Sequence, residues 1–489
     1  MTVTSPAAAS AAPSTLRLQP RLWQVAIATA ALPLGVAAAF RPALAVAAIL
    51  ALVLLPVVVT RPIVGLSAVV FLGFLENVAG LTGVLSVTKI IGALLVLGWL
   101  AIVATTPPEE RAGRGLVARQ PVLVAALVLL AAWAAISISW AEETAPAQQT
   151  VLRLLLNFVL FPIALVAIQR QRDVSWLFGV FIAGSLFTVV FGLLQGPSGK
   201  PGEAGRLQGA GVNPNQLGAY LTVAMVFAAV FFANRRSPAI ARWAALVAGS
   251  LAAVSLFLTL SRGALLGLGA VLLVAPLAVG RGRRAAALAL IVLTAAGATT
   301  WFAAVAPAAA VNRITHPAYG GGSGREDLWR VGWRMVNDHP ILGVGAGNFT
   351  VASIHYLLRP GATQRDKYVV GPSKEPAHNI YLTVLAELGV VGFALFAVIL
   401  AACLRSVILA ARAFAARGDP TMELLARALF IGLVGLLVTE FFSTALYSKQ
   451  LWFLLAAGPA LLALAQRSAP GERPDDRPPL ERVPVHARG

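Results

Sequence analysis

The stretch PVLVAALVLLAAWAAISISW, residues 121–140, contains no charged side chain over twenty consecutive positions. A helix of about 20 apolar residues crosses the roughly 30 Å hydrocarbon core of a bilayer, so this stretch predicts a transmembrane helix. Thirteen other apolar runs, separated by polar segments, predict the same structure. The fourteen predicted spans are 22–39, 43–59, 62–80, 86–104, 121–140, 149–168, 174–194, 215–233, 243–260, 263–279, 285–306, 377–403, 428–446 and 450–466.

Few charges separate the first four predicted spans. They are Arg41, Arg61 and Lys89, together with Glu76. A re-entrant pair is therefore an alternative to two full spans in this region. We expect an all-α polytopic membrane protein with about 12–14 transmembrane helices and one large outer loop, 307–376, that contains short amphipathic helices.

The composition of the 489 residues supports a membrane protein. Hydrophobic residues make up 58%, charged residues 12%, and the mean hydropathy is +0.81. This charge density cannot cover a water-facing surface, which excludes a soluble enzyme and a disordered chain. A disulfide scaffold is excluded because Cys403 is the single cysteine. The net charge of +18 comes from short basic clusters between apolar runs, which indicates membrane topology and no nucleic-acid partner.

The distribution of Lys and Arg favours a cytoplasmic N-terminus, because most basic residues then lie on the inner side and long loops escape the charge rule. We interpret the first span as an uncleaved helix, since further spans follow it. The expected division is a cytoplasmic N-terminus 1–21, N-terminal transmembrane helices 22–194, a core 195–403 with the outer loop, a cytoplasmic loop with the last two helices 404–466, and a disordered cytoplasmic tail 467–489.

The first outer polar motif is GRLQGAGVNPNQLGAYL, residues 205–221. Asn213 or Asn215 can cap the following helix, and Pro214 suits a helix entry. A capped turn accounts for the asparagines. It does not account for Arg206, which opposes the positive-inside trend and lies beside a helix N-terminus that favours anions.

The second motif is TLSRGALLG, residues 259–267, where Arg262 falls between two apolar runs at the expected outer face. A guanidinium in this position costs free energy unless it reaches water or meets an anion. Two interpretations remain open: an arginine that snorkels from a tight helix–helix turn, or an arginine that binds an anion.

The third motif is GREDLWRVGWRMVNDHPILGVGAGNF, residues 324–349. Ser323 and Glu326 form a capping-box pattern. Leu328, Trp329, Trp333 and Val336 then share one helical face, which predicts an amphipathic helix at the membrane surface. Arg325 lies in the first turn, where it can join free backbone N–H groups in holding phosphate. The GVGAGNF that ends the motif lacks the strand and helix context of a phosphate loop and is interpreted as a flexible loop.

The fourth motif is HNIYLTVLAELGVVGFALF, residues 378–396. His378 and Asn379 open the twelfth span. A neutral imidazole can accept a proton there, and a capping or water-facing histidine is the alternative. Glu387 is a functional candidate as a membrane acid, or it packs against or hydrogen-bonds a neighbour. No His or Cys pair has metal-ligand spacing and no Asp-x-Asp motif occurs, so we expect no metal site and no cofactor.

These four motifs, in this order around one large loop, resemble the O-antigen ligase and O-antigen polymerase family, most clearly over residues 205–396. The resemblance implies transfer of a glycan from an undecaprenyl-diphosphate carrier to a hydroxyl of a lipid or another glycan. By resemblance, Arg206 and Arg262 hold the diphosphate, Arg325 is a further match, and His378 activates the acceptor. Supporting roles are expected for Asn213, Asn215, Asn379 and Glu387.

The implied reaction takes place at the outer face of the bacterial cytoplasmic (inner) membrane and needs no metal. Arginines neutralise the leaving diphosphate, and in-line attack inverts the anomeric centre. The sequence does not separate a ligase from a polymerase of carrier-linked repeat units, nor does it predict the oligomeric state. A small-anion transporter is a second alternative, although transporters place polar groups near the bilayer midplane. The expected partners are the carrier-linked donor, the acceptor and the lipid bilayer.

Overall fold

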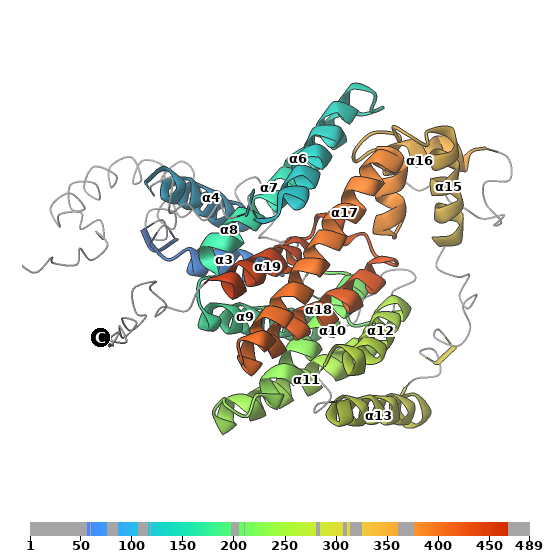
Figure 1. The fold of residues 1–489 in the computed structure, drawn as a ribbon. Helices are drawn as coiled ribbons and strands as arrows, with labels where there is room; N and C mark the ends of the chain where they lie inside the picture. Colours follow the sequence, from blue (N-terminus) through green and yellow to red (C-terminus); the bar gives the residue numbers. More distant parts are fainter. Residues whose placement is uncertain are drawn as a thin grey trace, which may run out of the picture.

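The computed structural model describes residues 56–58, 60–75, 87–105, 116, 117, 119–196, 205–209, 211–279, 284–306, 311, 312, 325–359 and 376–467. All regular structure in these residues is helical, which confirms the predicted all-α class. Figure 1 shows long helices and a smaller pair, α15 and α16, beside the first turns of α17. The predicted terminal segments 1–21 and 468–489, the span 22–39, most of the span 43–59, and residues 307–310, 313–324 and 360–375 of the outer loop lie outside the described residues.

The first half of the described chain forms a series of apolar helices. Val159 interrupts the predicted span 149–168, and the two resulting helices still run as one segment. A 3₁₀ turn, η1 (Ser137–Ser139), follows α6. The helices are α3 (Pro62–Gly73), α4 (Val87–Thr105), α6 (Pro121–Ile136), α7 (Thr144–Phe158), α8 (Leu160–Ala167) and α9 (Gln171–Gln195).

The second half contains the central bundle and the two shorter helices. A π-helical turn, η3 (Trp301–Val305), extends α13, and a 3₁₀ turn, η4 (Ala445–Tyr447), precedes the last helix. The helices are α10 (Pro214–Ala233), α11 (Ala239–Leu258), α12 (Arg262–Ala278), α13 (Arg284–Thr300), α15 (Arg325–Asp338), α16 (Phe349–Leu357), α17 (Ile380–Ala416), α18 (Pro420–Glu440) and α19 (Lys449–Gln466).

Seven helical segments of the described chain are long and apolar enough to cross a membrane, by length and composition. Three shorter apolar helices, α3, most of α4, and α12, accompany them. Each of the twelve spans predicted from residue 62 onward overlaps at least one helix. The chain is therefore an all-α polytopic membrane protein. The seven segments are Pro121–Ser139, Thr144–Ala167, Gln171–Gln195, Pro214–Ala233, Ala239–Leu258, Ile380–Ala416 and Pro420–Glu440.

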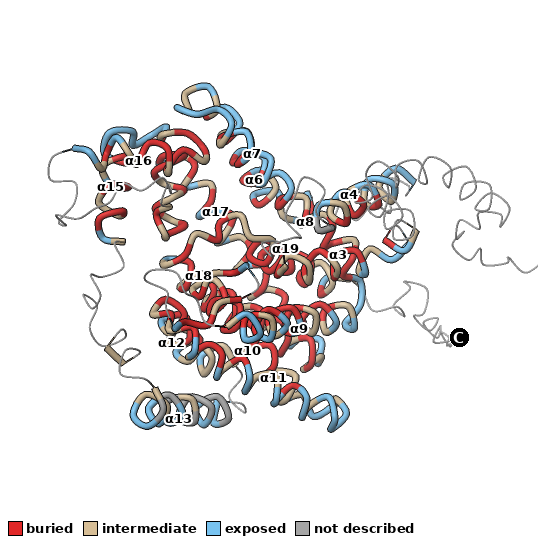
Figure 2. The backbone as a smooth tube through the Cα atoms, turned by 180° about the vertical axis from the view of Figure 1, so that it is seen from behind, coloured by how far each residue is buried: buried red, intermediate tan, exposed pale blue. Residues whose placement is uncertain are grey.

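Helix α18 lies at the centre of the bundle and packs against α10, α12 and α17, while α19 packs against α17 and α8. Figure 2 shows the buried backbone concentrated in these helices, with much of α11 and α13 exposed. Trp452 of α19 is fully buried, and its ring centroid lies 5.0 Å from that of Phe158. Apolar side chains on the periphery, such as Leu273 and Leu277, are largely exposed, as lipid-facing positions require.

The predicted helix end at residue 403 is wrong. Helix α17 continues to Ala416 and carries the exposed Arg405 and Arg412, so only a short turn precedes α18. The two arginines end the apolar run without ending the helix, because Ala, Leu and Arg all have high helix propensity. Asp419 starts the next helix by accepting a hydrogen bond from the Met422 N–H at 3.0 Å.

Helix α15 is amphipathic, but the predicted apolar face is partly wrong. Leu328 and Val336 are buried as expected, whereas the side chain of Trp333 is 54% exposed. The buried positions are 328, 331, 332, 335 and 336, because the helix packs its Gly332 side against Leu382 of α17. Packing on α17 therefore covers the face that carries Gly332, and Trp333 stays more than half exposed.

The GVGAGNF segment, residues 343–349, is not the flexible loop that we expected. Helix α17 is interrupted at Gly389 (φ 65°), which frees carbonyl groups of the preceding turn. The Ala386 and Glu387 carbonyls accept hydrogen bonds from the N–H groups of Val344 and Gly345, each at 2.9 Å. A Cβ atom at residue 389 would lie 2.0 Å from the Ile341 carbonyl oxygen, so this close approach requires glycine.

Candidate functional site

Three helices begin with a side-chain cap at the end of the bundle where α18 finishes. Asn213 caps α10 by accepting from the N–H groups of residues 215 and 216, at 3.1 and 2.9 Å. Ser261 caps α12 through the Ala264 N–H at 3.2 Å. Asn379 caps α17 through two N–H groups, both at 3.0 Å. Helix N-termini carry partial positive charge, so this end of the bundle favours an anion.

Arg206 joins the first two sequence motifs. Its side chain is buried, its Nε donates to the Thr259 carbonyl oxygen at 2.8 Å, and its Nη2 donates to Asn215 Oδ1 at 2.9 Å. The hydroxyl of Ser261 donates to the same Asn215 oxygen, also at 2.9 Å. From the sequence, either Asn213 or Asn215 could cap the helix. The structure gives the cap to Asn213 and uses Asn215 to link Arg206 to the 259–262 turn.

Arg262 is the first residue of α12 and follows the Ser261 cap directly. The turn before it contains Leu260 at φ 48°, a left-handed conformation that is rare for a β- or γ-branched residue. Gly263 lies against the ring of Phe442, which follows α18. Arg262 and Arg206 therefore flank one turn, and this turn touches the end of α18.

The third and fourth motifs meet next to Phe442. The Trp329 ring lies 6.1 Å from the Phe442 ring, and Trp329 Nε1 donates to the Ala377 carbonyl oxygen at 3.0 Å. His378 is the next residue after Ala377, so this hydrogen bond ties the third motif to the start of the fourth. Burial, and then the positive charge of Arg325, lower the pKa of His378 to about 4. His378 is therefore a neutral imidazole at pH 7, close enough to Arg325 to sense its charge.

The structure excludes one interpretation of His378, that of a helix cap. Asn379 provides the N-cap of α17, so His378 is not the cap. Its backbone has φ 51°, one of two positive φ values among the described non-glycine residues. Strained backbone of this kind is concentrated at functional sites, where surrounding contacts hold a side chain in a fixed direction.

Glu387 lies seven residues beyond the start of α17 and is 5% exposed. Its carboxylate accepts from the Gly347 N–H at 2.8 Å and from the Phe349 N–H at 3.2 Å. The Tyr447 hydroxyl lies 3.4 Å from the same carboxylate. The expected hydrogen bond to a neighbour is confirmed. Glu387 anchors the 343–349 segment and is not among the groups around Phe442.

Sequence reasoning missed the groups that assemble the site. Trp329, Phe442 and the carbonyl of residue 259 connect the four motifs. Trp329 and Thr259 lie in motifs that the sequence singled out, whereas Phe442 lies in none of them and the contacts themselves had no signal. No group of three or more His, Cys, Asp or Glu side chains that could hold a metal ion occurs in the described part of the chain.

Fold and site together define a polytopic helical membrane protein with a cationic cluster at one end of its bundle. Residues 247–397 match the family model described as O-antigen ligase. This match supports the assignment of the chain to the O-antigen ligase and polymerase family, and with it a role in polysaccharide biosynthesis. The matched region contains Arg262, Arg325 and His378, whereas Arg206 precedes it. No curated protein matches the chain.

Proposed function

We propose that this protein transfers a glycan from an undecaprenyl-diphosphate carrier to a hydroxyl acceptor at the outer face of the bacterial cytoplasmic membrane. The family match implies a membrane enzyme of the glycosyltransferase or ligase type. The observation that best supports the specific reaction is that Phe442, just after α18, contacts both the turn flanked by Arg206 and Arg262 and the Trp329 ring, whose indole N–H donates to the residue before His378.

The donor diphosphate is assigned to the arginine side of this cluster. A guanidinium keeps its charge at every physiological pH and pairs bidentately with phosphate oxygens. Three arginines and the capped N-termini of α10, α12 and α17 stabilise the negative charge that grows on the leaving group. Preorganised charge of this kind is usually the largest single contribution to the rate.

His378 is assigned the role of general base. The acceptor oxygen attacks the anomeric carbon, its proton moves to the imidazole, and the anomeric carbon–oxygen bond breaks with its electron pair on the diphosphate. In-line displacement inverts the anomeric centre. Burial is the larger cause of the lowered pKa of His378 and the charge of Arg325 is the smaller one; a bound diphosphate offsets the charge of Arg325. Donor binding therefore makes the imidazole a stronger base at the moment when it is needed.

Reconstitution tests this proposal. The purified chain in lipid is supplied with carrier-linked glycan and an acceptor lipid fraction, with and without a chelator. We expect glycan transfer and release of undecaprenyl diphosphate in both conditions, and a large loss of rate for Arg262→Ala. The matched control is Arg405→Ala, at an exposed position on α17. Glycan elongation without the lipid acceptor would identify a polymerase, and anion flux without transfer would overturn the proposal.

The outer location of the site is tested separately. After Cys403→Ser, a membrane-impermeant thiol reagent is applied to intact cells that carry Arg365→Cys or Arg236→Cys. We expect labelling at position 365 only. Labelling at position 236 only would place the arginine cluster on the cytoplasmic side and would overturn the assignment of the outer face.

A further inference from the structure

A second polar cavity, of about 250 Å³, lies beside His378 but apart from the arginine cluster. Its lining comes from α7, the 347–350 segment, the first turns of α17 and the 444–447 turn. Arg206, Arg262 and Arg325 do not line it. We name it the α7–α17 cavity. The polar side chains of its lining include Gln149, Thr150, Arg153, Thr383, Glu387 and Tyr447.

The inner part of the cavity is buried and rigid. Glu387 and Thr150 are each 5% exposed, and the Glu387 carboxylate is held by two backbone N–H groups and the Tyr447 hydroxyl. The position of the carboxylate is therefore fixed before any ligand arrives. Buried polar groups in a preformed cavity determine which ligand fits it.

The mouth of the cavity lies on α7. Gln149 and Arg153 are exposed and four residues apart, so they share one helical face. Gln148 is equally exposed, but its side chain does not line the cavity. The Gln149 amide and the Arg153 guanidinium thus lie at the entrance of the cavity, and the Glu387 carboxylate and the hydroxyl groups lie inside it.

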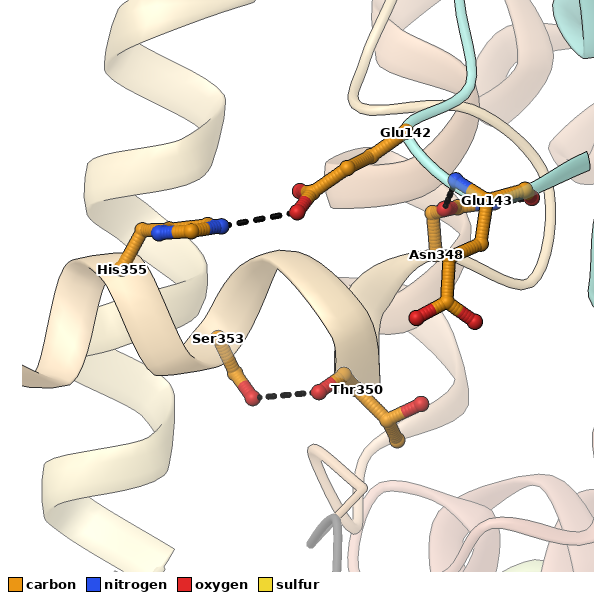
Figure 3. Close-up of polar contacts among 6 residues, drawn as sticks. All are labelled: Glu142, Glu143, Asn348, Thr350, Ser353 and His355. Atoms are coloured by element: carbon orange, nitrogen blue, oxygen red, sulfur yellow. Dashed lines mark hydrogen bonds and ion pairs between the residues drawn. The ribbon is translucent and has the colours of Figure 1, made fainter.

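The wall opposite α7 is held in place by contacts shown in Figure 3. The fully buried Asn348 accepts from the Glu143 N–H at 2.8 Å and donates to the Glu143 carbonyl oxygen at 3.1 Å. His355 of α16 lies 2.7 Å from Glu142. These contacts fix the 347–350 segment against the start of α7.

We propose that the α7–α17 cavity binds one sugar ring of the acceptor, which rests on the proposed glycan transfer. Sugar hydroxyl groups both donate and accept hydrogen bonds, and the lining offers carboxylate, hydroxyl, amide and guanidinium partners. The volume is below the roughly 300–1,000 Å³ of drug-sized sites, which limits the occupant to about one ring. Ala377 forms part of the wall, so a ring bound here lies beside the residue that precedes His378, and Arg206, Arg262 and Arg325 do not line the cavity.

Binding is tested without donor. The purified full chain in lipid nanodiscs is mixed with millimolar methyl glycosides of a neutral hexose and of a hexuronic acid, and binding is followed by saturation-transfer NMR. We expect the wild type and Gln148→Trp to bind at least one glycoside, and Gln149→Trp to lose most of the signal. Absence of binding to the wild type, or equal binding by both Trp variants, would overturn the proposal.

Transfer kinetics separate this inference from the proposed function. Arg153→Gln removes a charged hydrogen-bond donor, and we expect the KM for the acceptor to rise about tenfold or more while the affinity for the donor is kept. An unchanged acceptor KM in an enzyme that transfers glycan overturns the sugar site alone. Glycoside binding without any transfer overturns the proposed function and leaves the sugar site in place.

Discussion

The substitution His378→Asn separates the chemistry of the imidazole from its backbone conformation. Residue 378 has φ 51°, a left-handed conformation that asparagine tolerates and that costs other L-residues about 1–2 kcal/mol. Asn379 remains the N-cap of α17. We therefore expect the Asn variant to fold like the wild type, and His378→Ala to be less stable than the Asn variant by about 1 kcal/mol.

Turnover should respond differently from stability. An amide cannot act as a general base, and loss of general-base assistance lowers rates by about 10²–10⁴-fold. This loss corresponds to about 2.7–5.4 kcal/mol of transition-state stabilisation. Single-turnover transfer with labelled carrier-linked donor measures the rate, and thermal unfolding in lipid measures the stability. Donor affinity should change little, because the diphosphate is assigned to the arginines.

Two results would refute this reasoning. Wild-type turnover by the Asn variant would show that no proton passes through residue 378. A loss confined to donor binding would place His378 among the groups that hold phosphate. In either case Glu387 would be the next acid to test, because its carboxylate lines the adjacent cavity.

Three other substitutions or conditions have defined outcomes. Arg206→Lys should lower the rate of glycan transfer by about 10- to 100-fold, because one ammonium group cannot replace the Nε and Nη2 donors that bridge the Thr259 carbonyl and Asn215. As a control, Arg236→Lys at an exposed position should have no effect. Gly389→Ala should lower the melting temperature because its Cβ meets backbone, whereas Gly269→Ala, with nothing within 4 Å, should be stabilising by about 0.5–1 kcal/mol. The pKa of His378 is lower in the folded chain than in the unfolded chain, so the unfolded chain binds a proton first as the pH falls. The free energy of unfolding should therefore decrease between pH 6.5 and pH 4, by up to about 3 kcal/mol. Melting curves of His378→Asn at pH 7 and 5 should lack this loss.

The helical fold could be predicted because the bilayer imposes a single rule on length and polarity. Every backbone polar group in hydrocarbon must be paired within the segment, so apolar runs of sufficient length become helices. The predicted spans from residue 62 onward therefore overlap helices. The ends of the helices were predicted less accurately than their positions. The run after residue 403 contains Arg405 and Arg412, which end the apolar pattern while the helix continues into a more polar region.

The site was harder to predict because its contacts join residues that are far apart in the sequence. Arg206 and the Thr259 carbonyl are 53 positions apart, and the Trp133 indole donates to the carbonyl of Leu388, 255 positions away. Each motif could be recognised by its own residue pattern, but no single sequence shows which motifs touch. The break at Gly389 also left no signal, since the LAELG pattern resembles continuous helix.

The placement of Arg325 explains how a weak base can serve a transfer reaction next to water. With the site empty, burial and the charge of Arg325 keep the imidazole neutral and weakly basic, so it does not become protonated and inactive near pH 7. A bound diphosphate adds negative charge on the same side, which favours the protonated imidazole and raises its affinity for the acceptor proton. In the proposed reaction, the arginine assigned to the donor is then also the group that makes proton transfer depend on donor binding. An acceptor sugar in the α7–α17 cavity would lie beside Ala377, the residue that precedes His378. The left-handed backbone at residue 378 is consistent with a side chain that surrounding contacts hold in a fixed direction.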